Sequence, residues 1–351
     1  MQDLLKNVEK ELLTYPRRSM KATVKAGLKA LTGRKSAPHD AFSWPNGLLA
    51  MGLVEYYKKH KSSEEARDVI ATLRTYADRW LLKKCKMYGL QDALSGMTLL
   101  DLYEITGEER YKDGADLVAQ ALFSMETDNG GSIIFNPSSG NKYIFADMIG
   151  IVCPFLIRYG IQCDSNAALN LAITQIQNFL DRGMDEKTVL PYHGYDFESG
   201  TKYGIIGWGR AVGWLMLGLS GMLKYLPQDR PSYEPLKQAY RRIVDKVEAY
   251  QLPSGLYPWQ LSCKDGPMDT SATAMILYAI AESLENKVLI GIHKSRMVRG
   301  RDALLSMIQE GRVGGASAEC LDFNMYPLQF GSYPWSDGPT LALLAISEEE
   351  N

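Results

Sequence analysis

The sequence predicts an all-α fold in which twelve helices pair as six hairpins and close into an (α/α)6 barrel. Apolar residues recur at helical spacing along most of the 351 residues, whereas strand patterns are few and short. No long polar linker interrupts the helices, so we expect residues 1–351 to form one domain. An open helical solenoid is the alternative, but it should show a repeating sequence period, and none is visible.

The helix boundaries follow from apolar stripes and stop signals. In the segment 91–124, Leu99, Leu100 and Tyr103 form one stripe, and Gly107 ends that helix before the next stripe begins. Two strand-like segments, SIIF and TVLPY, are predicted to belong to loop hairpins at 132–135 and 188–192. The same patterns predict helices, in chain order, at 2–14, 44–60, 63–82, 91–106, 109–124, 144–160, 165–183, 208–225, 231–250, 269–285, 290–310 and 338–347.

Composition limits the class of protein. Hydrophobic residues make up 46% of the chain and charged residues 23%, which is typical of a globular protein rather than a disordered one. The net charge of -2 gives no global attraction to nucleic acid or to an anionic membrane. No apolar run approaches the roughly 20 residues of a membrane span, and no secretory signal is visible. We therefore expect a cytoplasmic protein without nucleic-acid or membrane partners, and a solvated helix and loop in the basic segment 17–35.

The cysteines and histidines form no metal-binding pattern. The five cysteines include no CxxC pair, so we expect reduced and mostly buried thiols. None of the four histidines lies near a cysteine cluster, which argues against a zinc site. The chain also lacks a phosphate-binding P-loop, a dinucleotide-binding glycine motif and the G-x-S-x-G motif of serine hydrolases.

The loops between the predicted helices are rich in glycine, proline and aromatic residues. Flat aromatic rings beside polar side chains commonly hold the apolar faces of sugar rings, although aromatic residues also fill the core of large helical proteins. Several tryptophans on recurrent loops favour a lined pocket. Five of the six tryptophans lie in these loops or at helix starts, namely Trp44, Trp208, Trp214, Trp259 and Trp335.

One acidic residue stands out inside an apolar run. Asp147 lies in YIFADMIGIVCPFL, near the start of a predicted helix whose apolar face includes Met148 and Ile151. An ionised carboxylate removed from water is costly unless it is paired or hydrogen-bonded, so this position needs an explanation. A structural cap at the helix start is one explanation, and a catalytic acid is the other. Asp92 in LQDALSG poses the same choice, with the two explanations about equally strong.

Two further residues complete a candidate catalytic set. His193 lies in the loop PYHGYD, and Arg210 lies in WGRAVGW at the start of another helix. Two carboxylates with a histidine and an arginine suit glycoside hydrolysis, since one acid can donate a proton while the other orients it or activates water. Pairing of Arg210 with a substrate carboxylate would indicate a uronic acid, but Arg210 could equally tie two loops together.

These motifs together resemble one enzyme family. ADMIGIVCPFL, followed by PYHGYD and WGRAVGW, resembles glycoside hydrolase family 105, the unsaturated rhamnogalacturonyl hydrolases, and less closely family 88. The resemblance covers most of the chain, from SWPNGLLAMGLVEYY to WSDGPTLALLA, and implies an (α/α)6 barrel. It also implies an enzyme of pectin degradation that hydrates a vinyl ether. This reaction removes a Δ4,5-unsaturated uronic acid from the non-reducing end of lyase-derived oligosaccharides.

The resemblance also implies residue roles. Asp147 is similar to the proton donor and water activator, which protonates C4 while water adds at C5, and the family reaction needs no metal or organic cofactor. Asp92 is similar to the second essential acid, and His193 and Arg210 match catalytic pocket residues. We expect the substrate to contact aromatic and amide side chains as well, namely Trp44, Trp208, Trp214, Asn136, Tyr192 and Trp335.

Four positions depart from the family pattern. Asn136 stands where many members have a histidine, and Tyr195 stands where tryptophan is common. Phe145 replaces a tryptophan two residues before the acid, and Gly150 replaces an aromatic residue three after it. These changes keep the proton donor and alter the pocket wall. Two other kinds of function stay open. One is another sugar enzyme of this fold, such as an ordinary glycosidase or an epimerase, which would need two pocket histidines; the other is a non-catalytic sugar-binding protein.

Overall fold

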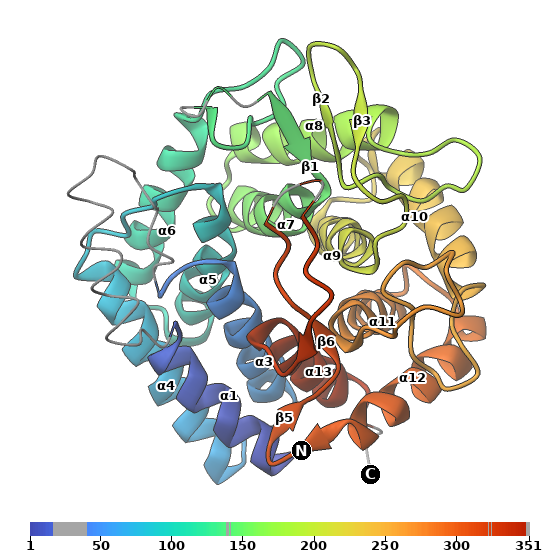
Figure 1. The fold of residues 1–351 in the computed structure, drawn as a ribbon. Coiled ribbons are helices and arrows are strands. Elements are labelled where there is room, and N and C mark those ends of the chain that lie inside the picture. The colour runs from blue at the N-terminus through green and yellow to red at the C-terminus, as the bar shows by residue number, and fades with distance from the viewer. Residues whose placement is uncertain (17–40, 138–139, 141, 322, 324, 349–351) are drawn as a thin grey trace, which may run out of the picture.

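The chain forms two concentric rings of helices. The computed structural model describes residues 1–16, 41–137, 140, 142–321, 323 and 325–348, so the basic segment 17–35 lies outside the described residues. Within these described ranges, twelve α-helices alternate between an outer and an inner ring (Figure 1). They are α1 (Gln2–Thr14), α3 (Trp44–Lys59), α4 (Glu64–Leu81), α5 (Gly96–Thr106), α6 (Glu109–Phe123), α7 (Ala146–Gln162), α8 (Asn166–Arg182), α9 (Gly209–Tyr225), α10 (Tyr233–Glu248), α11 (Thr270–Glu285), α12 (Lys294–Ser306) and α13 (Pro334–Ile346).

The inner ring closes on itself. It consists of α3, α5, α7, α9, α11 and α13, and α13 packs against α3 (Figure 1). The (α/α)6 barrel is therefore confirmed, and the open solenoid is wrong. Burial separates the two rings: inner α11 is buried on every face from Thr270 to Ser283, whereas outer α10 buries one stripe that includes Leu236, Tyr240 and Ile243.

Glycines allow the inner helices to approach closely. A Cβ atom added to Gly150 of α7 would lie 2.5 Å from the carbonyl oxygen of Trp214 on α9. A Cβ on Gly338 of α13 would overlap the carbonyl oxygen of Leu48 on α3. Real Cβ atoms do not come so close to backbone, so a side chain at either position would push two inner helices apart. Helix packing thus explains why glycine stands at position 150.

A small sheet forms part of the rim at one end of the barrel. β1 (Tyr143–Phe145), β2 (Gly194–Asp196) and β3 (Lys202–Tyr203) are antiparallel in the order β1-β2-β3, with Phe145 opposite Gly194. β1 leads directly into α7, and β2 follows the segment PYH, which ends at His193. The sheet therefore holds the start of α7 beside His193.

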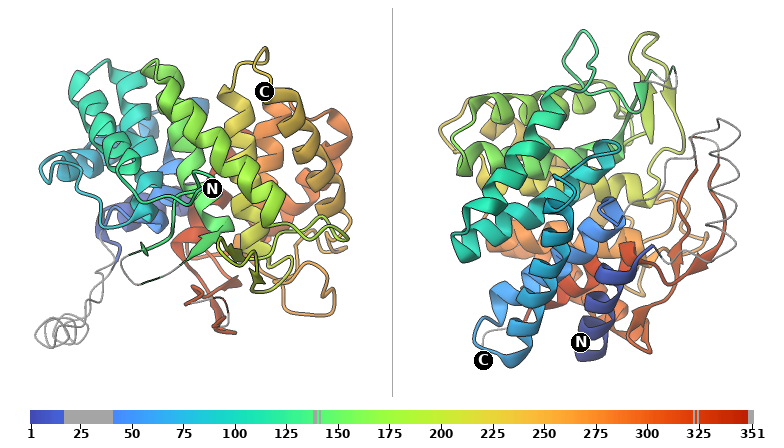
Figure 2. Two further views of the ribbon diagram at one scale, coloured as in Figure 1. Left: turned by 90° about the horizontal axis from the view of Figure 1, so that it is seen from above. Right: turned by 90° about the vertical axis from the view of Figure 1, so that its left-hand side faces the viewer.

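Two further strand pairs lie near the C-terminal helices. β4 (Ile308–Gln309) pairs with β5 (Arg312–Val313), and β6 (Ala316–Ser317) pairs with β7 (Phe330–Gly331). The connection from β6 to β7 reaches across the end of the barrel toward β1 (Figures 1 and 2). We call it the β6–β7 loop, and its described residues are 318–321, 323 and 325–329.

Three helices differ from their predicted bounds by more than two residues, for local reasons. The helix expected at 91–106 begins as a 3₁₀ turn, η1 (Leu90–Ser95), before α5. The helix expected at 290–310 is shortened to α12, because the chain turns back in the β4–β5 hairpin. The final inner helix begins at Pro334 rather than 338, since proline fits the first turn of a helix. No α-helix of the described residues combines the length and apolar character that crossing a membrane requires.

Both strand-like segments lie in loop hairpins, as predicted, but neither forms a full strand. The segments 132–135 and 188–192 make only isolated bridges, Thr127 to Ile133 and Met184 to Pro191. The observed strands are two or three residues long, which is too short for an alternating sequence pattern to develop. Their positions depend on neighbours that are distant in the sequence.

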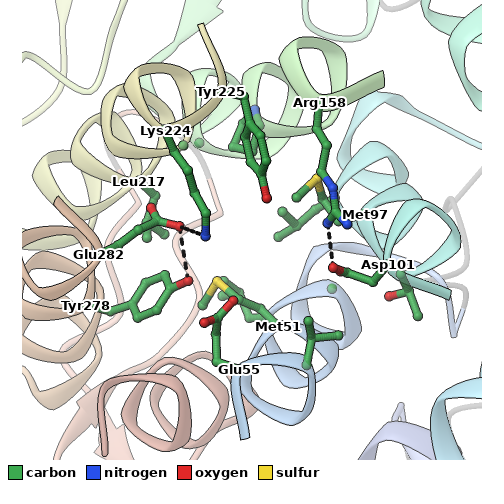
Figure 3. Close-up of a pocket in the computed structure, with 18 of the residues that line it drawn as sticks. Met51, Glu55, Met97, Asp101, Arg158, Leu217, Lys224, Tyr225, Tyr278 and Glu282 are labelled. Carbon is green, nitrogen blue, oxygen red and sulfur yellow. Dashed lines mark hydrogen bonds and ion pairs between the residues drawn. The ribbon is translucent and has the colours of Figure 1, made fainter. Parts of the chain in front are cut away.

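Charged side chains line a small cavity at the other end of the inner ring. Its volume of about 60 Å³ leaves room for about four water molecules. Arg158 of α7 donates to Asp101 of α5, and Lys224 of α9 lies 3.1 Å from Glu282 of α11 (Figure 3). Lys224 lies in the last turn of its helix and Arg158 near the end of its own, where cations favour the negative end of the helix dipole.

Candidate active site

A pocket of about 390 Å³ lies at the end of the barrel where the inner helices begin. This volume is within the roughly 300–1,000 Å³ that is usual for small-molecule sites. Seven of the ten predicted site residues line it, and Asp92, Tyr192 and Trp335 do not. The lining comprises Trp44, Leu90, Gln91, Phe135, Asn136, Tyr143, Phe145, Asp147, Met148, Ile151, His193, Trp208, Arg210, Trp214, Glu319, Cys320 and Leu321.

Asp147 is paired with a histidine rather than with the helix backbone. It lies in the first turn of α7, and its side chain is 23% exposed toward the pocket. Its Oδ2 atom lies 3.1 Å from His193 Nε2. The N-cap of α7 is Phe145, and Asp147 caps no backbone N–H group of the described residues. The structure therefore does not support the capping explanation for this acid.

The imidazole of His193 is held on both sides. Nδ1 lies 2.8 Å from the hydroxyl of Tyr326 on the β6–β7 loop, while Nε2 faces Asp147. The ring is buried and makes edge contacts with Trp208 and Phe145, at centroid distances of 4.7 and 5.0 Å. The Ala146 N–H group also donates to the His193 carbonyl at 2.8 Å, which fixes the start of α7 to this loop. Backbone and side chain thus set the Asp147–His193 pair together.

Arg210 ties α9 to the strand that leads into the β6–β7 loop. Its Nη1 donates to the Ser317 carbonyl at 2.8 Å, and its Nη2 donates to the Ala318 carbonyl at 2.6 Å. Nη1 also lies 3.7 Å from the buried carboxylate of Asp269. The guanidinium covers the ring of Trp208 at 4.6 Å. The loop-tying alternative is therefore realised, and Arg210 also lines the pocket.

Asp92 is buried beside the pocket instead of lining it. It belongs to η1, and its Oδ2 accepts the backbone N–H of Tyr88 at 2.7 Å. Its neighbours Leu90 and Gln91 do line the pocket. This contact stabilises the turn before η1, whose N-cap is Gly89 and has no side-chain cap, and a catalytic contribution of Asp92 stays a prediction.

The predicted tryptophans divide into lining and supporting rings. Trp44, Trp208 and Trp214 line the pocket. Trp335 lies behind Trp44 at a centroid distance of 5.0 Å, and its Nε1–H donates to the Ser317 carbonyl at 2.9 Å. Trp259 contacts Tyr326 at 5.9 Å. The three lining tryptophans therefore agree with the pocket interpretation, and the two supporting ones agree with core packing.

Of the two other predicted substrate contacts, one lines the pocket and one does not. Asn136 lines the pocket with a positive φ of 53°, which asparagine adopts more readily than most residues. Tyr192 lies outside the lining, and Lys202 Nζ is 5.5 Å from its ring centroid. Sequence reasoning missed Gln91, Glu319 and several residues of the β6–β7 loop, because nothing in their local sequence connects them with α7.

The cysteines contribute no reactive thiol or disulfide to this site. All five are free. Burial, together with the charge of Asp147, raises the pKa of the pocket residue Cys320 to about 12, so its thiol stays protonated. Within the described ranges, no group of three or more His, Cys, Asp or Glu side chains is arranged to hold a metal ion.

Comparison with known proteins identifies the family. The sequence model of Glycosyl Hydrolase Family 88 matches residues 18–325. The chain belongs to this family. The match confirms the resemblance to families 105 and 88 that the motifs indicated, and it makes the protein a glycoside hydrolase.

Curated and solved relatives of the chain fall in the same group. It is 25% identical over 284 residues to the unsaturated rhamnogalacturonyl hydrolase YesR of Bacillus subtilis (strain 168), covering 79% of this chain and 80% of YesR. A possible member of glycoside hydrolase family 105 from Salmonella enterica superposes with a TM-score of 0.83 and 17% identity, over 98% of this chain and 92% of that one. Unsaturated glucuronyl hydrolase from Bacillus sp. GL1 gives a TM-score of 0.74 and 16% identity, over 99% and 95%. At these identities the structural likeness establishes the fold.

Proposed function

We propose that this glycoside hydrolase removes a Δ4,5-unsaturated uronic acid from the non-reducing end of short oligosaccharides by vinyl-ether hydration. The Asp147–His193 pair in an aromatic pocket is the observation that supports the proposal most directly. The family-88 match agrees with it. The relationship to YesR favours a rhamnose-bearing leaving group of pectic origin.

Asp147 supplies the proton in the proposed reaction. Its Oδ2 is engaged by His193, so Oδ1 is the oxygen that carries the proton to C4. After the transfer, the Asp147 carboxylate accepts a proton from the water molecule that adds at C5. The product is a hemiketal, whose opening leaves a hemiacetal at C1 that releases the leaving sugar. One water molecule is consumed, and Asp147 returns to its protonated form.

The start of the inner ring suits an anionic sugar. Trp44, Asp147 and Arg210 all lie in the first turns of their helices and line the pocket. Helix N-termini carry partial positive charge, and the Arg210 guanidinium lies beside them, paired with the buried Asp269 carboxylate. A uronate carboxylate is thereby attracted although the Nη atoms of Arg210 already bond the loop. The lining indole rings offer flat surfaces to the sugar.

A panel of unsaturated disaccharides tests the proposal. Turnover destroys the C4=C5 double bond, so ultraviolet absorbance is lost, and mass analysis should show a keto-uronate and a free sugar with one water added in total. We expect the rhamnose-bearing disaccharide to react fastest. Products of unchanged mass would indicate an epimerase, and binding without absorbance loss would indicate a non-catalytic protein; either result refutes the proposal. Among the described histidines only His193 lines the pocket, which disfavours a two-histidine epimerase.

We also propose a cytoplasmic location. All five cysteines are free thiols, and a reducing compartment preserves thiols of this kind. Detection of the enzyme in the soluble cytoplasmic fraction after cell fractionation would agree with this placement, and detection outside the cytoplasm would refute it.

A further inference from the structure

We infer that Tyr326 is a positioning residue for the Asp147–His193 pair. Its hydroxyl holds His193 in the tautomer that carries the proton on Nε2, so that Nε2–H donates to Asp147 Oδ2. The catalytic consequence of this arrangement rests on the proposed hydration reaction, whereas the tautomer itself does not.

The hydrogen-bond geometry indicates the direction of each donor. The Tyr326 oxygen lies 2.8 Å from His193 Nδ1 and 3.4 Å from the backbone nitrogen of Ile205. The Ile205 N–H group can only donate, so it occupies a lone pair of the hydroxyl oxygen. The hydroxyl proton is then available to donate to Nδ1, and the inferred arrangement has Nδ1 as the acceptor. A neutral imidazole with an accepting Nδ1 carries its proton on Nε2, the atom that lies 3.1 Å from Asp147.

Aromatic contacts keep Tyr326 in this place. Its ring makes edge contacts with Trp208 at 5.2 Å and with Trp259 at 5.9 Å. Earlier in the same loop, Phe323 stacks on Phe145 at 4.3 Å, and it also lies 5.3 Å from the ring of His193. Two separate side chains therefore attach the β6–β7 loop to the wall around the catalytic pair.

The fixed tautomer decides which oxygen of Asp147 is available for chemistry. With Nε2–H donating to Oδ2, the transferable proton is confined to Oδ1. In the opposite tautomer, Nε2 would present a lone pair to Asp147. Nε2 would then accept the Asp147 proton, which would no longer be available for transfer to the substrate. Loss of the Tyr326 hydroxyl therefore reduces kcat rather than substrate binding.

Nitrogen NMR of the imidazoles tests the tautomer without any substrate. The chain has four histidines, and His193→Gln identifies the signals of His193. At a pH where the imidazole is neutral, we expect the wild type to show unprotonated Nδ1 and protonated Nε2. Tyr326→Phe keeps the ring contacts and should show a mixture of both tautomers. A wild type protonated on Nδ1, or a Tyr326→Phe spectrum identical to that of the wild type, would overturn the inference.

Kinetics supply the second measurement. We expect Tyr326→Phe to lower kcat on an unsaturated disaccharide by about tenfold to a hundredfold with little change in KM, a part of the ~10²–10⁴ that acid–base catalysis contributes. Tyr203→Phe is the matched control, because Tyr203 packs on Phe323 at 5.5 Å without contacting His193. An unchanged kcat in Tyr326→Phe would contradict the positioning role. A wild type inactive on every disaccharide would refute the proposed function, and the NMR result would then decide the inference alone.

Discussion

The ring of Phe323 stacks on the ring of Phe145, with centroids 4.3 Å apart and an interplanar angle of 15°. Phe145 immediately precedes α7, and Phe323 belongs to the β6–β7 loop near the other end of the sequence. The wall beside Asp147 is therefore completed by residues from both halves of the chain. Phe145, one of the departures from the family pattern, is the attachment point for that loop.

Phe323→Ala should weaken catalysis much more than global stability. Aromatic pairs contribute about 0.5–1.5 kcal/mol beyond area burial, and their loss here would release the loop that holds Tyr326. We expect kcat/KM, measured by loss of double-bond absorbance, to fall by about tenfold. A lost stacking contribution of up to about 1.4 kcal/mol corresponds to this factor of ten. The control is Phe330→Ala in β7, whose side chain is 37% exposed. Equal losses in both variants would contradict a specific role for the stack.

Asp147→Asn should abolish turnover and leave the fold intact. Asparagine keeps the shape and can still accept from His193, but it cannot deliver a proton to C4, so we expect at least about a hundredfold loss of kcat. Asp164→Asn just beyond α7 is the matched control, since its φ of 51° suits asparagine and it lies outside the pocket. Wild-type rates in Asp147→Asn would remove this acid from the mechanism.

Arg158→Met tests the charged cavity at the other end of the barrel. Among the described residues, it leaves the buried carboxylate of Asp101 with Lys58 as its ion-pair partner, at 3.6 Å from Nζ, and with the more distant charge of Lys224. Breaking a buried ion pair costs about 3–5 kcal/mol. Because Lys58 still compensates part of the Asp101 charge, we expect the free energy of unfolding to fall by about 3 kcal/mol, the lower end of this range. Activity at 25 °C should not change. The exposed ion pair between Arg110 and Glu108 provides the control. Arg110→Met should lower the free energy of unfolding, measured with urea, by less than about 1 kcal/mol. If Arg158→Met lost no more free energy of unfolding than Arg110→Met, the charge pairs of this cavity would not stabilise the fold.

Asp337→Asn should stabilise the protein at alkaline pH. Burial raises the pKa of Asp337 to about 7, above its ordinary value of 3.8. Between these two pH values the folded state holds a proton that the unfolded state releases, so wild-type stability falls as pH rises and the loss is complete above pH 7. Asparagine keeps the acceptor for the Val313 N–H group, which is 2.7 Å away, and removes the charge.

We therefore expect Asp337→Asn to exceed the wild type in free energy of unfolding at pH 8 by at most about 4 kcal/mol, with a smaller difference at pH 5. Urea unfolding at both pH values measures this. Asp113→Asn at an exposed position of α6 should show no such dependence. A stability difference between Asp337→Asn and the wild type that is the same at pH 5 and pH 8 would contradict the raised pKa.

The helices could be predicted because burial leaves a record in the local sequence. Inner α11 is apolar on all faces and outer α10 on one, and both patterns are visible without a structure. Asp147 could be found because a lone acid in an apolar run is conspicuous. Tyr326 could not be found, since its partner His193 is distant in sequence and the β6–β7 loop has no periodicity that records this contact. Asp92 was ambiguous because a turn cap and a catalytic acid use the same residue type.

The close contact of Gly150 with Trp214 also restricts how this enzyme can evolve. An added Cβ would meet the Trp214 carbonyl oxygen at 2.5 Å, so a bulkier residue at position 150 requires a simultaneous shift of α9. No single substitution there can bring in an aromatic side chain while the barrel keeps its geometry. The β6–β7 loop carries no such constraint at its exposed residues Leu321 and Leu328. New leaving-sugar preferences are therefore accessible by mutation through the loop, while the helical scaffold that carries the acid stays unchanged.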